Sequence, residues 1–158
     1  MIKIIEGNIL NATDSIICHQ TNTQGIMGGG LALQIKNKYP KVYEEYRSAC
    51  IKYLIQGKSL LGEVLFGINT GDGNSIANLF GQERYGRDKR YTDYNALKKS
   101  LTEVLEVVTN EYGLLYDSPI AIPYSLGCGL AGGDWKIVYK IIEDVFKDYD
   151  KVTIYKFK

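Results

Sequence analysis

Two glycine-rich segments are the features of this chain best suited to bind a ligand. The first glycine loop is Met27–Ala32, and the second glycine loop is Ser125–Gly133. Glycine lets backbone amides turn toward an anion and lets that anion approach without meeting a Cβ atom. Each loop follows an apolar run typical of a buried strand and precedes a helical pattern, whose free N–H groups also favour an anion. The pair therefore predicts a cleft that grips a diphosphate from both sides.

Two polar residues lie just before the first glycine loop. His19 is the only histidine of the chain and ends an apolar run. Near neutral pH an imidazole can act as general acid or base, and a neighbouring phosphate would favour its protonated form. Asn22 could hold a ribose hydroxyl or orient a water through its amide. A residue that only orients the loop, or an ordinary turn residue, would look the same in the sequence. We take His19 and Asn22 as the candidate catalytic residues.

The three cysteines do not form a pattern typical of a disulfide framework or a metal site, and only Cys128 is a candidate nucleophile. Cys128 lies inside the second glycine loop, where a thiolate nucleophile would need a nearby base or a lowered pKa. A small residue that fits a tight loop is the simpler interpretation. Cys18, Cys50 and Cys128 are widely spaced, and with a single histidine they form neither a disulfide framework nor a zinc pattern. We therefore expect no metal and no cofactor.

A cationic segment lies between the two glycine loops. This cationic loop, Arg84–Arg90, carries three arginines, one lysine and a tyrosine, and a further tyrosine follows it. It could contact phosphates, stack on a base or touch a modified macromolecule, or it could be a solvated loop with no ligand. The sequence leaves these alternatives open.

The length and charge of the chain exclude several classes of protein. With 158 residues it is expected to form one domain with a sizeable core. A net charge of +1 argues against a mainly electrostatic nucleic-acid binder. The first residues do not read as a secretory signal, and no apolar stretch approaches membrane-spanning length. We expect a cytoplasmic monomer with no membrane partner.

The elements that must position these residues follow from apolar periodicity and turn chemistry. Strands are predicted at 2–6, 15–19, 63–68, 75–80, 120–123 and 151–157, and helices at 30–39, 42–55, from a cap at 92 or 93 to about 111, and from a cap at 134 to about 147. The strands at 63–68 and 75–80 flank a turn-rich link and should pair as a hairpin. Strands that alternate with helices indicate an α/β layer structure, and the hairpin makes its sheet mixed.

The motifs together resemble those of the macrodomain family, small α/β modules that bind ADP-ribose. Ile5–Leu10 resembles the adenine-site motif, with Asn in place of the usual Asp, and His19–Ala32 resembles the first ribose- and phosphate-binding loop. Ile122–Leu130 resembles the second phosphate loop, and Thr153–Tyr155 resembles the last strand. The match covers nearly the whole chain. It implies that residues 1–158 form a single three-layer α/β/α macrodomain with a central mixed sheet.

The resemblance also implies a set of ligand-binding residues. Asn8 and Ile9 would flank the adenine, and His19 and Asn22 would lie near the distal ribose. On local grounds a helix or turn cap explains Asn8 equally well. Backbone amides of both loops would hold the diphosphate, namely those of Gly28, Gly29, Gly30, Leu31, Ala32, Ser125, Leu126, Gly127, Cys128, Gly129 and Leu130.

Two branches of the family are most similar to this chain. The ADP-ribose 1''-phosphate phosphatase branch shares the Gly-Asn-Ile start, the strand-end histidine, the triple-glycine loop and a segment like Tyr39–Lys41. The terminal ADP-ribose glutamate hydrolase branch shares the histidine and the Gly-Cys-Gly-Leu loop. Its lysine, however, would fall near Gln82, with Lys89 in the same loop, and its aspartate at Ala131. The aspartate of MacroD-type hydrolases would fall near Ala32. These departures favour the phosphatase-like interpretation.

The leading hypothesis is an enzyme that binds ADP-ribose or a derivative and removes a group from its distal ribose, most simply the phosphate of ADP-ribose 1''-phosphate. One alternative is a non-catalytic module that binds ADP-ribose or another NAD metabolite. Another is a hydrolase that releases ADP-ribose from modified protein or nucleic acid. A general nucleotide-binding protein is a fourth hypothesis, but the chain has no P-loop Gly-Lys-Ser/Thr sequence.

Overall fold

A computed structural model of the chain describes residues 2–157 and contains a six-stranded sheet in the order β1-β6-β5-β2-β4-β3. The strands are β1 (Lys3–Glu6), β2 (Ile16–Gln20), β3 (Val64–Gly67), β4 (Ser75–Leu79), β5 (Ile120–Pro123) and β6 (Val152–Lys156). Every neighbouring pair is parallel except β3 and β4, which are antiparallel. The predicted hairpin and mixed sheet are thus confirmed.

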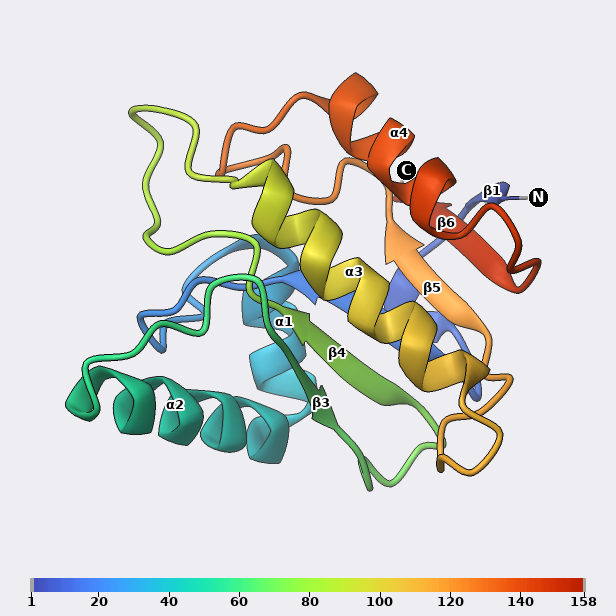
Figure 1. The fold of residues 1–158 in the computed structure, drawn as a ribbon, viewed down its shortest axis with the longest axis horizontal. Coiled ribbons are helices and arrows are strands. Elements are labelled where there is room, and N and C mark those ends of the chain that lie inside the picture. The colour runs from blue at the N-terminus through green and yellow to red at the C-terminus, as the bar shows by residue number, and fades with distance from the viewer. Residues whose placement is uncertain (1, 158) are drawn as a thin grey trace.

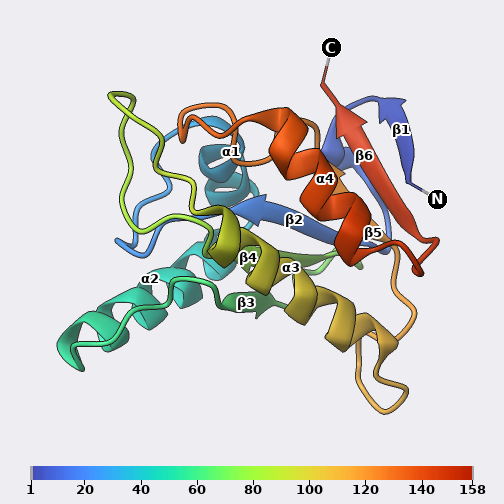
Figure 2. The same ribbon diagram turned by 45° about the horizontal axis from the view of Figure 1, so that its top comes forward.

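Helices cover both faces of this sheet. They are η1 (Ile9–Asn11), α1 (Gly30–Lys38), α2 (Pro40–Ile55), α3 (Tyr94–Thr109) and α4 (Trp135–Val145). Figures 1 and 2 show α3 and α4 side by side over one face, with α1 behind the sheet. Val42 of α2 packs with Ile17 and Ile76 on the same side as α1. The three-layer α/β/α prediction is confirmed. No helix among residues 2–157 is both long and apolar enough to cross a membrane.

Strand β2 shows how the core positions the candidate site. Ile16 and Cys18 belong to the core beneath α3 and α4, whereas Ile17 packs with the α1 and α2 side. Because a strand buried on both faces needs apolar residues throughout, β2 reads as a continuous apolar run. Successive side chains alternate between faces, so His19 lies on the same face as Ile17, and Gln20 lies on the same face as Cys18. The two polar residues at the end of β2 therefore lie on opposite faces of the sheet.

Helices α3 and α4 begin at the capping residues that the sequence predicts. Asp93 caps α3 by accepting from the Ala96 amide at 3.0 Å, and Asp134 caps α4 by accepting from the Lys136 amide at 2.9 Å. The sequence also predicts an apolar stripe of Leu31, Leu33 and Ile35 along the helix at 30–39, and this prediction is wrong at Leu33, which is 37% exposed. It lies two residues from Ile35, and positions two apart do not share a helix face.

Candidate functional site

A cleft of about 640 Å³ opens where the parallel strands β2, β4 and β5 end. Parallel strands present their carboxyl ends at one edge, which brings the glycine loops after β2 and β5 together although they are distant in sequence. The cleft is lined by residues 19–22, Ile26, 28–32, Gln82, 85–87, 123–127 and 129–131. Both predicted loops thus meet at one site, as expected.

The first glycine loop ends as a helix N-terminus. Gly29 is the N-cap of α1 and places no side chain on the amides behind it. Within residues 2–157, the amides of Gly28 to Ala32 donate no hydrogen bond. The first amides of a helix have no partner in their own helix, so they are free to bind an anion.

The second glycine loop has a different backbone. It forms successive turns, with Ser125 and Gly127 at φ +65° and +70°. The amides of Leu126 and Cys128 already donate to the carbonyls of Pro123 and Ser125, at 3.1 and 2.8 Å. Helix α4 begins only at Trp135, beyond the cap at Asp134. This loop therefore offers amides from its turns rather than from a helix end.

The remaining amides of the second loop are available to a ligand. Among the described residues, those of Ser125, Gly127, Gly129 and Leu130 have no acceptor. The two loops also approach each other, because a Cβ atom at Gly29 would lie 3.1 Å from Cδ1 of Leu130. The residues that carry these free amides line the same cleft, and the two loops are in contact there.

His19 is a buried, neutral imidazole on the wall of this cleft. Burial lowers its pKa to about 4, and this effect outweighs the hydrogen bond to Asn78. The Asn78 amide nitrogen donates to the Leu65 carbonyl at 3.1 Å, which leaves Asn78 Oδ1 to accept from His19 Nε2 at 2.6 Å. His19 Nδ1 is then an unprotonated acceptor, and it has no partner within residues 2–157. The ligand-free protein thus holds the opposite protonation state from the one expected beside a phosphate.

Asn22 lines the cleft, yet most of its amide is used to shape the first loop. Its Oδ1 accepts from the Gln24 amide at 2.9 Å and from the Tyr46 hydroxyl at 2.9 Å. Its Nδ2 donates to the Ile26 carbonyl at 2.8 Å. Asn22 is therefore placed to position the loop, and one amide hydrogen remains for a ligand.

Sequence reasoning missed the role of Gln20, which joins three segments. Its Nε2 donates to Gln82 Oε1 and to Thr92 Oγ1, both at 2.8 Å. Thr92 in turn donates to the Gly127 carbonyl at 2.6 Å. Gln20 thus ties the base of the cationic loop to the second glycine loop. A polar residue directly after His19, at the end of a buried strand, was the signal that could have found it.

Part of the cationic loop reaches the cleft. Tyr85, Gly86 and Arg87 line it, whereas Arg84 does not. Figure 1 shows residues 82–91 projecting from the sheet beside the segment that follows β5. The Tyr91 amide donates to the Ala131 carbonyl at 2.7 Å and fixes one end of this projection.

Three of the proposed ligand-binding residues lie outside the cleft lining: Asn8, Ile9 and Cys128. Asn8 caps η1 by accepting from the Leu10 amide at 3.0 Å, and Ile9 is buried in the core. Burial raises the pKa of Cys128 to about 11, and its Sγ contacts the Leu126 carbonyl at 3.2 Å. Cys128 is thus a protonated thiol that fits a tight turn, the simpler of its two interpretations.

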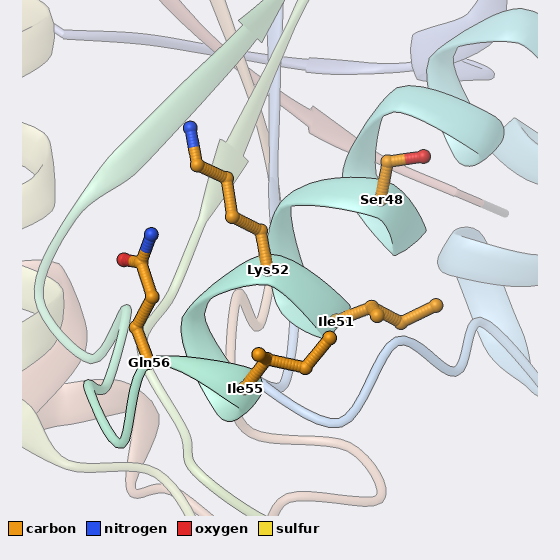
Figure 3. Close-up of a pocket in the computed structure, with 5 residues that line it drawn as sticks. All are labelled: Ser48, Ile51, Lys52, Ile55 and Gln56. Atoms are coloured by element: carbon orange, nitrogen blue, oxygen red, sulfur yellow. The ribbon is translucent and has the colours of Figure 1, made fainter.

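A second hollow, of about 370 Å³, lies on the outer side of α2. Figure 3 shows the side chains of Ser48, Ile51, Lys52, Ile55 and Gln56 spread around the end of this one helix. All five belong to α2 or to its C-cap, and none of the candidate catalytic or ligand-binding residues is among them. This hollow is part of an exposed helix surface rather than a built site.

Comparison with known proteins decides the family. The family model described as Macro domain matches residues 18–142, which is most of the chain. The chain belongs to the macrodomain family. A solved Bacteroides thetaiotaomicron protein of unknown function has the same fold, with a TM-score of 0.82, 26% identity and coverage of 99% of this macrodomain and 98% of that chain.

Relatives with named activities fall into two groups. An ADP-ribose 1''-phosphate phosphatase of Candida glabrata is 27% identical, over 98% of this macrodomain and 98% of its own length. A DNA ADP-ribosyl transferase-DNA ADP-ribosyl glycohydrolase fusion protein of Thermosipho africanus is 29% identical over 87% of this macrodomain. The macrodomain corresponds to only 37% of the length of that fusion protein. A solved structure of Thermosipho africanus DarTG in complex with ADP-ribose has the same fold, with a TM-score of 0.78 and 23% identity over 98% of this macrodomain and 41% of that chain.

Proposed function

We propose that this macrodomain binds ADP-ribose 1''-phosphate in the cleft and hydrolyses its phosphate ester. The observation that carries the proposal is the set of free backbone amides that the two glycine loops bring to one cleft. Rows of preorganised N–H groups suit a diphosphate, because they stabilise its charge without reorganising. The match to the phosphatase relative over 98% of both chains supports the same activity.

Gln82 favours release of phosphate over a hydrolase reaction in which a lysine amine of the enzyme takes part. It lines the cleft, near the position at which the resemblance to the hydrolase branch implies a lysine. Its amide nitrogen donates to the Arg84 carbonyl at 2.7 Å, and its oxygen accepts from Gln20. An amide held on both sides is neither a nucleophile nor a base.

His19 is the group placed to accept a hydrogen bond from a water or a ribose hydroxyl. Its Nε2 proton is held by Asn78, so Nδ1 supplies the acceptor. In the reaction, a water oxygen bonds to phosphorus while the bond between phosphorus and the C1'' oxygen breaks. A proton originating from the water ends on that departing oxygen, and the products are ADP-ribose and inorganic phosphate. His19 orients the water, and the loop amides hold the diphosphate in place.

The test is release of inorganic phosphate from ADP-ribose 1''-phosphate, with ADP-ribose and ATP affinities measured by calorimetry on the same preparation. We expect selective ADP-ribose binding and turnover that falls at least tenfold in His19→Ala. Selective binding without any phosphate release would instead identify a non-catalytic binding module. Comparable affinity for ATP and ADP-ribose would contradict the ADP-ribose assignment itself.

Release of ADP-ribose from modified DNA is the second candidate function. The named glycohydrolase relatives and the exposed cationic loop support it. An ADP-ribosylated oligonucleotide is the matching substrate, and released ADP-ribose is the readout. Turnover of this substrate without phosphate release from the 1''-phosphate would reverse the order of the two candidates.

A further inference from the structure

The cations of the cationic loop are not equivalent. The Lys89 ammonium lies 5.3 Å from the ring centroid of Tyr91, and the Arg90 guanidinium lies 4.4 Å from that of Tyr94. The carboxylate of Asp88 accepts from the Tyr91 hydroxyl at 2.6 Å. Arg87, in contrast, makes no ion pair, hydrogen bond or ring contact within residues 2–157. Its guanidinium is therefore available to a ligand.

Arg87 is also the only cation of this loop that lines the cleft among the described residues. A guanidinium presents paired N–H groups that match two oxygens of a phosphate. The diphosphate is already provided for by the amides of the two glycine loops. Arg87 is therefore suited to a further anionic group on the same ligand.

Strand order indicates which part of the ligand Arg87 faces. The glycine loops follow the adjacent strands β2 and β5, whereas the cationic loop follows β4, on the side away from β6 and β1. Asn8 and Ile9, at which the resemblance to the family implies the adenine, follow β1 at the other end of the sheet and lie outside the cleft lining. With the diphosphate between the glycine loops and the adenine toward β1, the distal ribose extends toward β4. Arg87 lies at that end.

We propose that Arg87 binds an anionic substituent on the distal ribose, namely the 1''-phosphate, and sets the preference for this substrate over unmodified ADP-ribose. The inference rests on the proposed function. The loop is anchored for this role at both ends, by the bond of Gln82 to Gln20 and by that of Tyr91 to Ala131.

The experiment compares Arg87→Ala with Arg84→Ala, a variant of an arginine in the same loop that lies outside the cleft. For Arg87→Ala we expect kcat/KM for ADP-ribose 1''-phosphate to fall about tenfold to a hundredfold, the range for a lost charge-assisted hydrogen bond. The Kd for ADP-ribose should change less than about twofold, as for any group that contacts only the missing phosphate. Arg87→Lys should restore part of the loss, and Arg84→Ala should match the wild type.

Binding separates this inference from the proposed function. If the wild type releases no phosphate, the proposed function fails, yet the inference still requires tighter binding of ADP-ribose 1''-phosphate than of ADP-ribose. That difference must disappear in Arg87→Ala. Equal losses for both ligands in Arg87→Ala would overturn the inference, because Arg87 would then contact the shared part of the ligand. Unchanged binding and turnover would overturn it as well.

Discussion

The two glycine loops border one cleft but reach it by different backbones. The first ends as the N-terminus of α1, so its amides from Gly28 to Ala32 are free because a helix start leaves them so. The second is a series of turns that contain residues with positive φ, and the amides of Leu126 and Cys128 donate hydrogen bonds within these turns. Similar glycine motifs thus work in two ways. The first loop needs glycine so that no side chain blocks its free amides, whereas the second needs glycine to adopt positive φ angles.

Gly29→Glu gives the largest effect expected from this comparison. Gly29 has an extended φ of −156°, which any residue adopts, so the fold should persist. Its side chain would enter the cleft next to Leu130 and place a negative charge on the phosphate path. We expect the Kd for ADP-ribose to rise at least ~100-fold, or about 2.7 kcal/mol, with little change in Tm. Calorimetry and thermal unfolding measure both, and Gly29→Ala, which adds no charge, should lose less. Unchanged ADP-ribose affinity in Gly29→Glu would show that the loop assignment is wrong.

His19, which precedes the first loop, should make stability depend on pH. Its pKa is lowered from 6.5 to about 4 in the folded chain, so the unfolded chain binds the proton more strongly between these values. The contribution is therefore complete above pH 6.5 and is lost as pH falls toward 4. Between pH 7 and 5 we expect a loss of about 2 kcal/mol in the free energy of unfolding.

Urea unfolding at the two pH values, without ligand, measures this loss. His19→Gln keeps a side chain that can donate to Asn78 but does not titrate, so its stability should fall less over the same interval. The same acid dependence in wild type and His19→Gln would assign the effect to other groups.

Gly127→Ala tests whether the second loop depends on its conformation. Gly127 has φ +70°, and a Cβ atom there would lie 2.7 Å from Gln20 Oε1. We expect a rise of about tenfold in the Kd for ADP-ribose, or ~1.4 kcal/mol, together with a lower Tm. Gly129→Ala is the matched control for Tm, because its Cβ would meet nothing within 4 Å. If both variants unfold alike, the conformational account of this loop is wrong.

Cys128→Ser should have the smallest effect. The thiol is protonated near neutral pH and lies in a turn, where a serine hydroxyl can bond to the same Leu126 carbonyl. We expect kcat and Kd to stay within about twofold of the wild type, since no thiolate is required. Loss of turnover with retained ADP-ribose binding would return Cys128 to the list of nucleophiles.

Much of the fold was predictable because its signals are local. The apolar run of β2, the caps at Asp93 and Asp134 and the turn-rich link between β3 and β4 each specify their element within a few residues. The stripe through Leu33 failed because it was read at a spacing of two. Glycine loops after two such strands also sufficed to place the cleft, since parallel strands end at one edge.

The sequence by itself determined the family, the α/β layers and the two glycine loops that border the cleft, because strand periodicity, caps and glycine loops act over short distances. Only the tertiary structure decided what the polar groups do. Burial makes His19 neutral and Cys128 an inert thiol, and packing commits Asn22 to its loop. Strand order alone brings Arg87 to the β4 end of the cleft. Desolvation and hydrogen-bond partners depend on distant segments, so no local pattern could reveal them.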